Sequence, residues 1–213
     1  MKIKINKNIS FDYNKRPLII AEISGNHAGN KNKFLKLILN AHKSGADLVK
    51  IQTYEPDDIT IQNTNFKINN GIWKGKKLWG LYKKACTPYE WHHDAFKIAK
   101  KYKINLFSTP FSLRALNFLK KKKVDLYKVS SFEITDLNLI NEIAKTRKPI
   151  ILSTGLSTIL EIKRSLKIIN KYHNKVIILH CVSEYPTKLV NSNLNRIKEI
   201  KKTFKKNMIG LSD

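Results

Sequence analysis

Short runs rich in β-branched residues alternate along this chain with longer runs of helical periodicity, and this alternation limits the fold more than any other feature. The predicted strands are residues 18–24, 48–54, 105–111, 126–133, 149–155, 176–183 and 208–213. The predicted helices are Lys31–Ser44, Tyr89–Lys103, Leu113–Lys122, Asn138–Lys145, Ile159–Tyr172 and Asn193–Phe204. Repeated βα units predict a parallel sheet, and strands that are apolar through their middles are expected to be covered on both faces.

Two α/β folds have this pattern: an open, doubly wound sheet and a TIM (β/α)8-type barrel. A doubly wound nucleotide-binding sheet usually carries a glycine-rich phosphate loop after its first strand, and AEISGNHAGN lacks the G-x-G-x-x-G spacing. Every predicted strand ends instead on polar side chains that can take part in chemistry. Because strand ends converge on one face of a barrel, the pattern favours the TIM-type barrel, with about seven βα strands in this chain.

The stretch from Glu55 to Pro88 is too long for an ordinary βα loop, and it contains the aromatic segment GIWKGKKLWGLYKKACTPYEW. We therefore predict one barrel domain over residues 1–213 with an insertion at 55–88. Two interpretations of the insertion stay open. It is either a lid that contacts substrate or a flap that covers helices without touching a ligand.

The balance of charge is strongly basic, with 41 Lys and Arg against 16 Asp and Glu. The lysines are dispersed over nearly every predicted helix and no nucleic-acid-binding motif accompanies them, so we expect no specific nucleic-acid partner. The two cysteines, Cys86 and Cys181, show neither metal-ligand spacing nor a disulfide framework, which fits a reducing compartment. No signal peptide and no apolar run near the roughly 18 residues of a membrane span is evident, so we expect a cytoplasmic protein without membrane association.

Two lysines lie inside apolar strands, Lys50 in LVKIQTY and Lys128 in LYKVSSF. Burying a lysine is costly unless it meets an anion. Together with the hydroxyls of Thr109, Ser131 and Ser153 at the same strand ends, the two lysines predict a pocket for a small, multiply charged anion. The alternative is that each lysine pairs with a nearby carboxylate or extends toward solvent.

Two carboxylates belong to the same strand ends, Glu22 in AEIS and Glu133 in SSFE. Either could act as a general base or accept a hydrogen bond from a sugar hydroxyl, and the alternative for both is an ion pair with a strand lysine. His180 in ILHC has no second ligand at metal-binding spacing, so a satisfied core or rim histidine is favoured over a metal ligand.

Taken together, these motifs resemble the sialic acid synthase family. The matching segments are IIAEISGNHAGN, GADLVKIQTY, FSTPF, YKVSSFEITDLNLI, KPIILSTGLST, LHCVSEYPT and IGLSD, in order from about residue 17 to residue 213. Within the family, SSFEITD, WKGKKLWGLYKKACTPYEWH and HCVSEYPT most resemble the pseudaminic acid synthase branch, whereas N-acetylneuraminate synthases tend to have Gly-Ser-Gly-Glu at the fourth strand end.

The resemblance implies a transferase of carbohydrate biosynthesis that condenses phosphoenolpyruvate with an open-chain N-acetylated amino sugar and releases phosphate. The pseudaminic branch uses 2,4-diacetamido-2,4,6-trideoxy-altrose, and an N-acetylneuraminate or legionaminate synthase is the alternative. The resemblance implies catalytic roles for Lys50 and Lys128, and for Glu22 near the metal and the reacting water. The residues implied to bind substrate are Thr109, Ser131, Glu133, Ser153, Ser183, Tyr185 and Ser212.

The resemblance also implies a homodimer and a divalent metal, Mg²⁺ or Mn²⁺. In the family, the first metal-binding histidine directly follows the Ser-Asp pair that is Ser212-Asp213 here, so the ligands are expected beyond Asp213 and none within this chain. The eighth strand and a small C-terminal antifreeze-like domain are also missing. We therefore expect a truncated barrel, and the alternative to an active synthase is an inactive or split fragment that needs a separate C-terminal piece.

Overall fold

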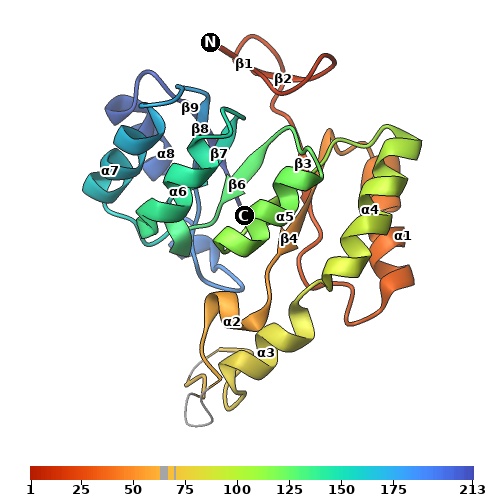
Figure 1. Ribbon diagram of the computed structural model, residues 1–213. Coiled ribbons are helices and arrows are strands. Elements are labelled where there is room, and N and C mark those ends of the chain that lie inside the picture. Colours follow the sequence, from red (N-terminus) through yellow and green to blue (C-terminus); the bar gives the residue numbers. More distant parts are fainter. Residues whose placement is uncertain (63–66, 70) are drawn as a thin grey trace. The chain divides into compact units, whose positions relative to one another are not determined.

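The computed structural model describes residues 1–62, 67–69 and 71–213, and its chain divides into two compact units (Figure 1). One unit is Leu18–Val124, called the 18–124 unit below. The other combines Met1–Pro17 with Asp125–Asp213 and is called the 125–213 unit. The single domain expected over residues 1–213 stays a prediction.

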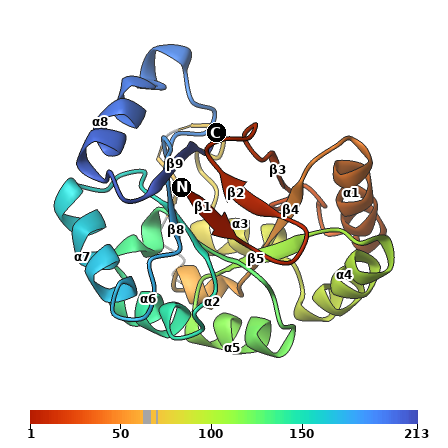
Figure 2. The same cartoon turned by 90° about the horizontal axis from the view of Figure 1, so that it is seen from above.

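The 18–124 unit contains three parallel strands in the order β3 (Ile20–Glu22), β4 (Leu48–Thr53) and β5 (Leu106–Pro110). Its helices are α1 (Lys31–Lys43), α2 (Pro56–Ile59), α3 (Leu78–Ala85), α4 (Tyr89–Tyr102) and α5 (Leu113–Lys121). Helices α1 and α4 lie side by side (Figures 1 and 2). Phe34 and Ile38 of α1, Val49 and Ile51 of β4 and Ala95 of α4 are all fully buried, so the core of this unit lies between these helices and the strands.

The 125–213 unit has four parallel strands in the order β6 (Tyr127–Val129), β7 (Ile150–Ser153), β8 (Val176–His180) and β9 (Met208–Leu211). Its helices are η1 (Phe132–Thr135), α6 (Leu137–Ala144), α7 (Ile159–Ile169), η2 (Leu189–Asn191) and α8 (Asn195–Thr203). Helices α6, α7 and α8 lie along one side of its strands (Figure 2). The antiparallel hairpin β1 (Lys2–Lys4) and β2 (Ser10–Asp12) also belongs to this unit, and the hydroxyl of Tyr13 accepts a hydrogen bond from the N–H of Ile209.

Helix starts are set by local capping. The side chains of Asn30, Ser112, Asp136 and Thr158 each accept a hydrogen bond from the backbone N–H three residues later, at the starts of α1, α5, α6 and α7. Such a bond satisfies one of the backbone donors that an α-helix leaves without a partner in its first turn. Because these signals are local in the sequence, the predicted helices begin within a few residues of the observed ones.

Each of the seven predicted strands contains an observed strand, and each of the six predicted helices contains or overlaps an observed one. The predicted insertion at 55–88 contains the short helices α2 and α3, while its residues 63–66 and 70 lie outside the described residues. The β1–β2 hairpin was not predicted. No helix of the described ranges combines the length and the apolar character that crossing a membrane requires.

Strand register places the polar strand ends on one face within each unit. Glu22 is aligned with Lys50, and Gln52, two residues along β4, is aligned with Thr109. In the other unit Lys128 is aligned with Ile151, two residues before Ser153. Because successive side chains alternate between the two faces of a strand, the aligned residues and their neighbours two positions away share a face. In the 18–124 unit the opposite face, which carries Val49 and Ile51, packs into the core.

Candidate active site

Lys50 forms the centre of a polar cluster in the 18–124 unit. Lys50 is only 6% exposed. Its ammonium group is ion-paired with the carboxylate of Glu22, and its Nζ donates a hydrogen bond to Oγ1 of Thr109 at 3.2 Å. The strand register brings these three predicted site residues together. The ion pair that the sequence left open as an alternative is therefore present for Lys50 and Glu22, and it offsets the cost of burying the lysine.

Ser24 holds the other oxygen of the Glu22 carboxylate. The backbone N–H of Ser24 donates to Oε1 of Glu22 at 2.9 Å, and Nε2 of Gln52 lies 3.4 Å from Oγ of Ser24. Ser24 has a φ of 46°, in the left-handed region that non-glycine residues adopt only at a cost. Ser24 thus orients the carboxylate of a predicted catalytic residue.

The strand ends of the 125–213 unit converge on Gly155. Its backbone N–H donates to Oγ of Ser131 and to Sγ of Cys181, at 3.1 Å each, and that oxygen and sulfur are themselves 3.1 Å apart. A Cβ atom at position 155 would stand 2.5 Å from Oγ of Ser183. The structure thus brings the predicted residues Ser131 and Ser183 together, and it adds Gly155 and Cys181, which the sequence analysis did not select.

Three buried polar atoms near the same strand ends have no hydrogen-bond partner among the described residues: Oγ of Ser130, Oγ of Ser153 and Oε2 of Glu133. Ser153 is only 1% exposed. Leaving a buried polar group without a partner costs about 1–3 kcal/mol, so such groups are uncommon and call for an explanation. A ligand with oxygen atoms would supply the missing partners.

Glu133 has a strongly perturbed carboxyl group. Burial raises its pKa to about 7, while a backbone hydrogen bond and the charge of Lys128 act in the opposite direction. At neutral pH the group therefore exists in both protonation states. A carboxyl group of this kind can accept or donate a proton or a hydrogen bond, which is the property expected of a residue that handles sugar hydroxyls.

The remaining predicted residues of this unit lie on or beside its strands. Lys128 is partly buried on β6, Tyr185 is 64% exposed, and the N–H of Ser212 donates to the carbonyl oxygen of His180 at 2.9 Å. His180 itself is buried, with Nε2 2.9 Å from the carbonyl oxygen of Ser192. The interpretation of His180 as a satisfied core or rim histidine is confirmed.

Comparison with known proteins decides the family. The sequence profile described as the NeuB family matches residues 37–213, most of the chain. The chain belongs to the NeuB family. It is 42% identical over 207 residues to the pseudaminic acid synthase of Campylobacter jejuni subsp. jejuni serotype O:23/36, covering 96% of this chain and 60% of that protein. It is 40% identical over 200 residues to the pseudaminic acid synthase of Helicobacter pylori, covering 92% and 58%. The chain thus spans about 60% of the length of these curated relatives.

Solved structures confirm the fold class. The N-acetylneuraminic acid synthetase of Leptospira borgpetersenii, crystallised with citrate, matches with a TM-score of 0.88 and 30% identity, over 100% of this chain and 70% of that one. A phospho-2-dehydro-3-deoxyheptonate aldolase of Thermotoga maritima matches with a TM-score of 0.70 at 12% identity, over 99% of this chain and 54% of that one, which bears on the fold alone. The predicted α/β barrel of the TIM type is confirmed for this member of the NeuB family.

The metal expected from the family resemblance finds no site in the part of the chain that the structure describes. Within residues 1–62, 67–69 and 71–213, no three His, Cys, Asp or Glu side chains are grouped so that they could hold a metal ion. The dependence on a divalent metal that the resemblance implies therefore stays a prediction.

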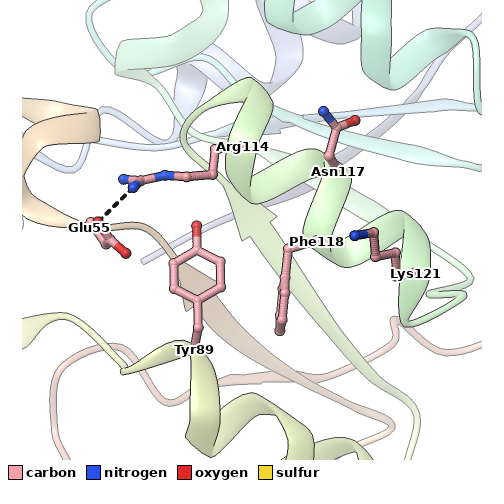
Figure 3. A pocket seen from close by; sticks show the side chains of 6 residues that line it. All are labelled: Glu55, Tyr89, Arg114, Asn117, Phe118 and Lys121. Atoms are coloured by element: carbon pink, nitrogen blue, oxygen red, sulfur yellow. Dashed lines mark ion pairs between the residues drawn. The ribbon is translucent and has the colours of Figure 1, made fainter.

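A shallow hollow on the 18–124 unit shows how the insertion of this NeuB-family chain is anchored. Its lining residues are Glu55, Tyr89, Arg114, Asn117, Phe118 and Lys121 (Figure 3). The Arg114 guanidinium on α5 is ion-paired with Glu55 at 2.7 Å and with Asp58 of α2 at 3.0 Å. Because this guanidinium links α5 to Glu55 and to Asp58 of α2, we interpret the hollow as an attachment of the 55–88 segment to α5.

Proposed function

We propose that this chain provides the substrate-binding strand ends of a phosphoenolpyruvate-dependent nonulosonic acid synthase. The reaction condenses phosphoenolpyruvate with 2,4-diacetamido-2,4,6-trideoxy-altrose to give pseudaminic acid and phosphate. The observation that carries the proposal is the buried Lys50 cluster together with the buried hydroxyls of Ser130 and Ser153 at strand ends, which have no partner among the residues that the structure describes. The identity of 42% to a pseudaminic acid synthase supports this sugar over those of N-acetylneuraminate or legionaminate synthases, which remain the alternative.

In the proposed reaction, the enol carbon of phosphoenolpyruvate forms a bond to the aldehyde carbon of the sugar. The aldehyde oxygen takes up a proton and becomes a hydroxyl group, and positive charge develops on the carbon that carries the phosphate. Water adds there with loss of one proton, and the new hydroxyl group loses its second proton as the C–O bond to phosphate breaks, which leaves a keto group. The two protons released by water balance the one taken up by the aldehyde oxygen and the one carried away by phosphate. Lys50 and Lys128 supply the cations that hold the carboxylate and phosphate of phosphoenolpyruvate and stabilise the departing phosphate. Alignment of the two bound reactants supplies a further part of the acceleration.

The hydroxyl and carboxyl groups have separate proposed roles. Thr109, Ser131 and Ser153 complete the hydrogen bonds to phosphoenolpyruvate. The set proposed to line the same substrate is Ser183, Tyr185 and Ser212. Glu133, whose pKa of about 7 allows both protonation states, binds the sugar hydroxyls, and Glu22 accepts a proton from the reacting water. The ion pair with Lys50 and the hydrogen bond from the N–H of Ser24 support this assignment because they hold the Glu22 carboxylate in place.

Further parts of the proposal follow from the resemblance to the family. They are dependence on Mg²⁺ or Mn²⁺ with ligands outside the described residues, a homodimer, and a cytoplasmic location. We also propose that the insertion at 55–88 acts as a lid over substrate. Within this insertion, Trp79 of α3 donates a hydrogen bond to Asp57 of α2 at 2.8 Å, which joins its two helices.

The central test replaces Lys128 with methionine, which keeps the chain length and removes the charge. Two quantities are measured: binding of phosphoenolpyruvate by titration calorimetry, and release of phosphate from phosphoenolpyruvate plus each of the three candidate sugars. We expect Lys128→Met to lose both while its circular dichroism spectrum stays that of the wild type. The matched control is Lys120→Met, because Lys120 is an exposed residue of α5. Undiminished turnover in Lys128→Met would sink the assignment.

A further inference from the structure

Gly155 and Cys181, which are not among the proposed substrate contacts, lie within hydrogen-bond distance of the Ser131 hydroxyl. Ser131 lies beyond β6 and Cys181 directly follows β8, yet their Oγ and Sγ atoms are 3.1 Å apart. Gly155, just beyond β7, donates its single N–H to both atoms at 3.1 Å. The ends of three strands therefore meet in one small hydrogen-bonded group.

The hydrogen bonds from Gly155 and Cys181 determine which interactions of the Ser131 hydroxyl remain open to a ligand. A serine hydroxyl has one donor hydrogen and two acceptor lone pairs, and a thiol is a weak donor and a weak acceptor. When the Cys181 thiol donates to Ser131, the thiol and the N–H of Gly155 fill both lone pairs of Oγ. The hydroxyl hydrogen of Ser131 is then the one remaining interaction, and it is free to be donated to a ligand.

The reverse arrangement would not serve an anion. If Ser131 donated its hydrogen to Sγ of Cys181, its oxygen would present only a lone pair to a bound ligand. A lone pair repels an anionic oxygen, whereas a donated O–H attracts it. An anionic ligand therefore selects the arrangement in which Cys181 is the donor.

A separate observation indicates that a ligand belongs on this face. Ser153, two residues before Gly155 on the same strand, is 1% exposed and its Oγ has no partner among the described residues. Ser153 is aligned with Leu179, two residues before Cys181, so both side chains point to the same face of the strands. A buried hydroxyl without a partner on that face requires an acceptor or donor from elsewhere.

We propose that Cys181 and Gly155 are positioning residues that turn the Ser131 hydroxyl hydrogen toward an anionic oxygen of phosphoenolpyruvate. This inference rests on the proposed function and adds two residues to it. Gly155 is required for a second reason, because a Cβ atom there would stand 2.5 Å from Oγ of Ser183 and 3.0 Å from Oγ of Ser131. The first of these distances is too short for a carbon–oxygen contact, so a side chain at position 155 would displace both serines.

The test compares Cys181→Ala, Cys181→Ser, Ser131→Ala and the double variant Ser131→Ala with Cys181→Ala. Phosphoenolpyruvate binding is measured by titration calorimetry, and turnover, where present, is separated into kcat and KM. Losing one hydrogen bond to a charged ligand weakens affinity by about 10- to 150-fold. We expect Ser131→Ala and Cys181→Ala each to weaken binding to about this extent, and Cys181→Ser, which keeps a donor, to restore it to within about 2-fold of the wild type.

The double variant should bind no more weakly than Ser131→Ala alone, because Cys181 acts only through Ser131. The matched control is Ser44→Ala, since Ser44 is an exposed residue at the C-terminal end of α1 and lies outside both the proposed site and the 55–88 insertion, and it should bind as the wild type does. Equal weakening by Cys181→Ser and Cys181→Ala, additive losses in the double variant, or wild-type binding by Cys181→Ala would each overturn the positioning role alone. Absence of phosphoenolpyruvate binding by the wild type would overturn the proposed function and this inference with it.

Discussion

Lys50 and Ser153 are both buried polar residues on parallel strands, but their surroundings differ. Lys50 in the 18–124 unit has the carboxylate of Glu22 and the hydroxyl of Thr109 as partners. Ser153 in the 125–213 unit has no hydrogen-bond partner among the described residues, and Oε2 of Glu133 shares this state. The first cluster satisfies itself without a ligand, whereas the second pays a cost in free energy that a ligand would remove. Removing a group should therefore have opposite effects on stability in the two units.

The largest effect on stability is expected from Glu22→Gln. This change leaves the ammonium group of Lys50, with a side chain only 7% exposed, without its counter-charge. Breaking a buried pair by neutralising one partner costs about 3 kcal/mol of unfolding free energy. Urea unfolding at neutral pH measures the loss.

The matched control is Lys50→Met, which strands the other partner. The Glu22 side chain is 36% exposed and can be hydrated, so this loss should be smaller, about 1 kcal/mol. Equal losses for the two variants would contradict the view that the lysine is the buried member of the pair.

Much of the fold was predictable because its signals are local. The alternation of β-rich and helical runs gave all seven strands of the βα series, and capping residues such as Asn30 and Thr158 mark helix starts directly in the sequence. The β1–β2 hairpin was missed because its two strands are three residues each in a polar stretch, where periodicity carries little information.

The site was predictable in part, for a similar reason. A lysine inside an apolar strand is visible in the sequence, so Lys50 could be selected and its carboxylate partner foreseen as an alternative. The contacts around Gly155 could not be predicted from the sequence. They depend on three strand ends that are separated by 24 and 26 residues and that meet only after folding. Ser24 was visible as a polar strand end, but its positive φ is set by tertiary structure.

A second, pH-dependent effect is expected from Glu133→Gln. Burial raises the pKa of Glu133 from 4.5 to about 7, so the folded protein binds this proton more tightly than the unfolded chain does. The stabilising contribution of this carboxyl group is therefore fully present below pH 4.5. It is lost as the pH rises through about 7, which lowers the unfolding free energy by up to about 3 kcal/mol. In Glu133→Gln this fall should disappear, so that the variant is more stable than the wild type at pH 8.

The measurement is urea unfolding of both proteins at intervals from pH 5 to pH 8. Burial lowers the pKa values of His27, His92 and His173, and these groups reduce stability as the pH falls below their ordinary value of 6.5. The difference between wild type and variant cancels them, because both proteins contain the same histidines. A difference that does not change with pH would show that the Glu133 carboxyl is not perturbed.

The smallest and most direct contrast comes from removing one hydroxyl in each unit. Thr109→Val keeps the shape of the side chain but removes the acceptor for Nζ of Lys50, so it should lower the unfolding free energy by about 1 kcal/mol. Ser153→Ala removes a buried hydroxyl that has no partner among the described residues, so it should leave stability unchanged or raise it by up to about 1 kcal/mol. Urea unfolding of the two variants with no ligand present gives the signs. Losses of equal size would mean that the Ser153 hydroxyl is satisfied in solution, and the contrast between the two units would then rest on Glu133 alone.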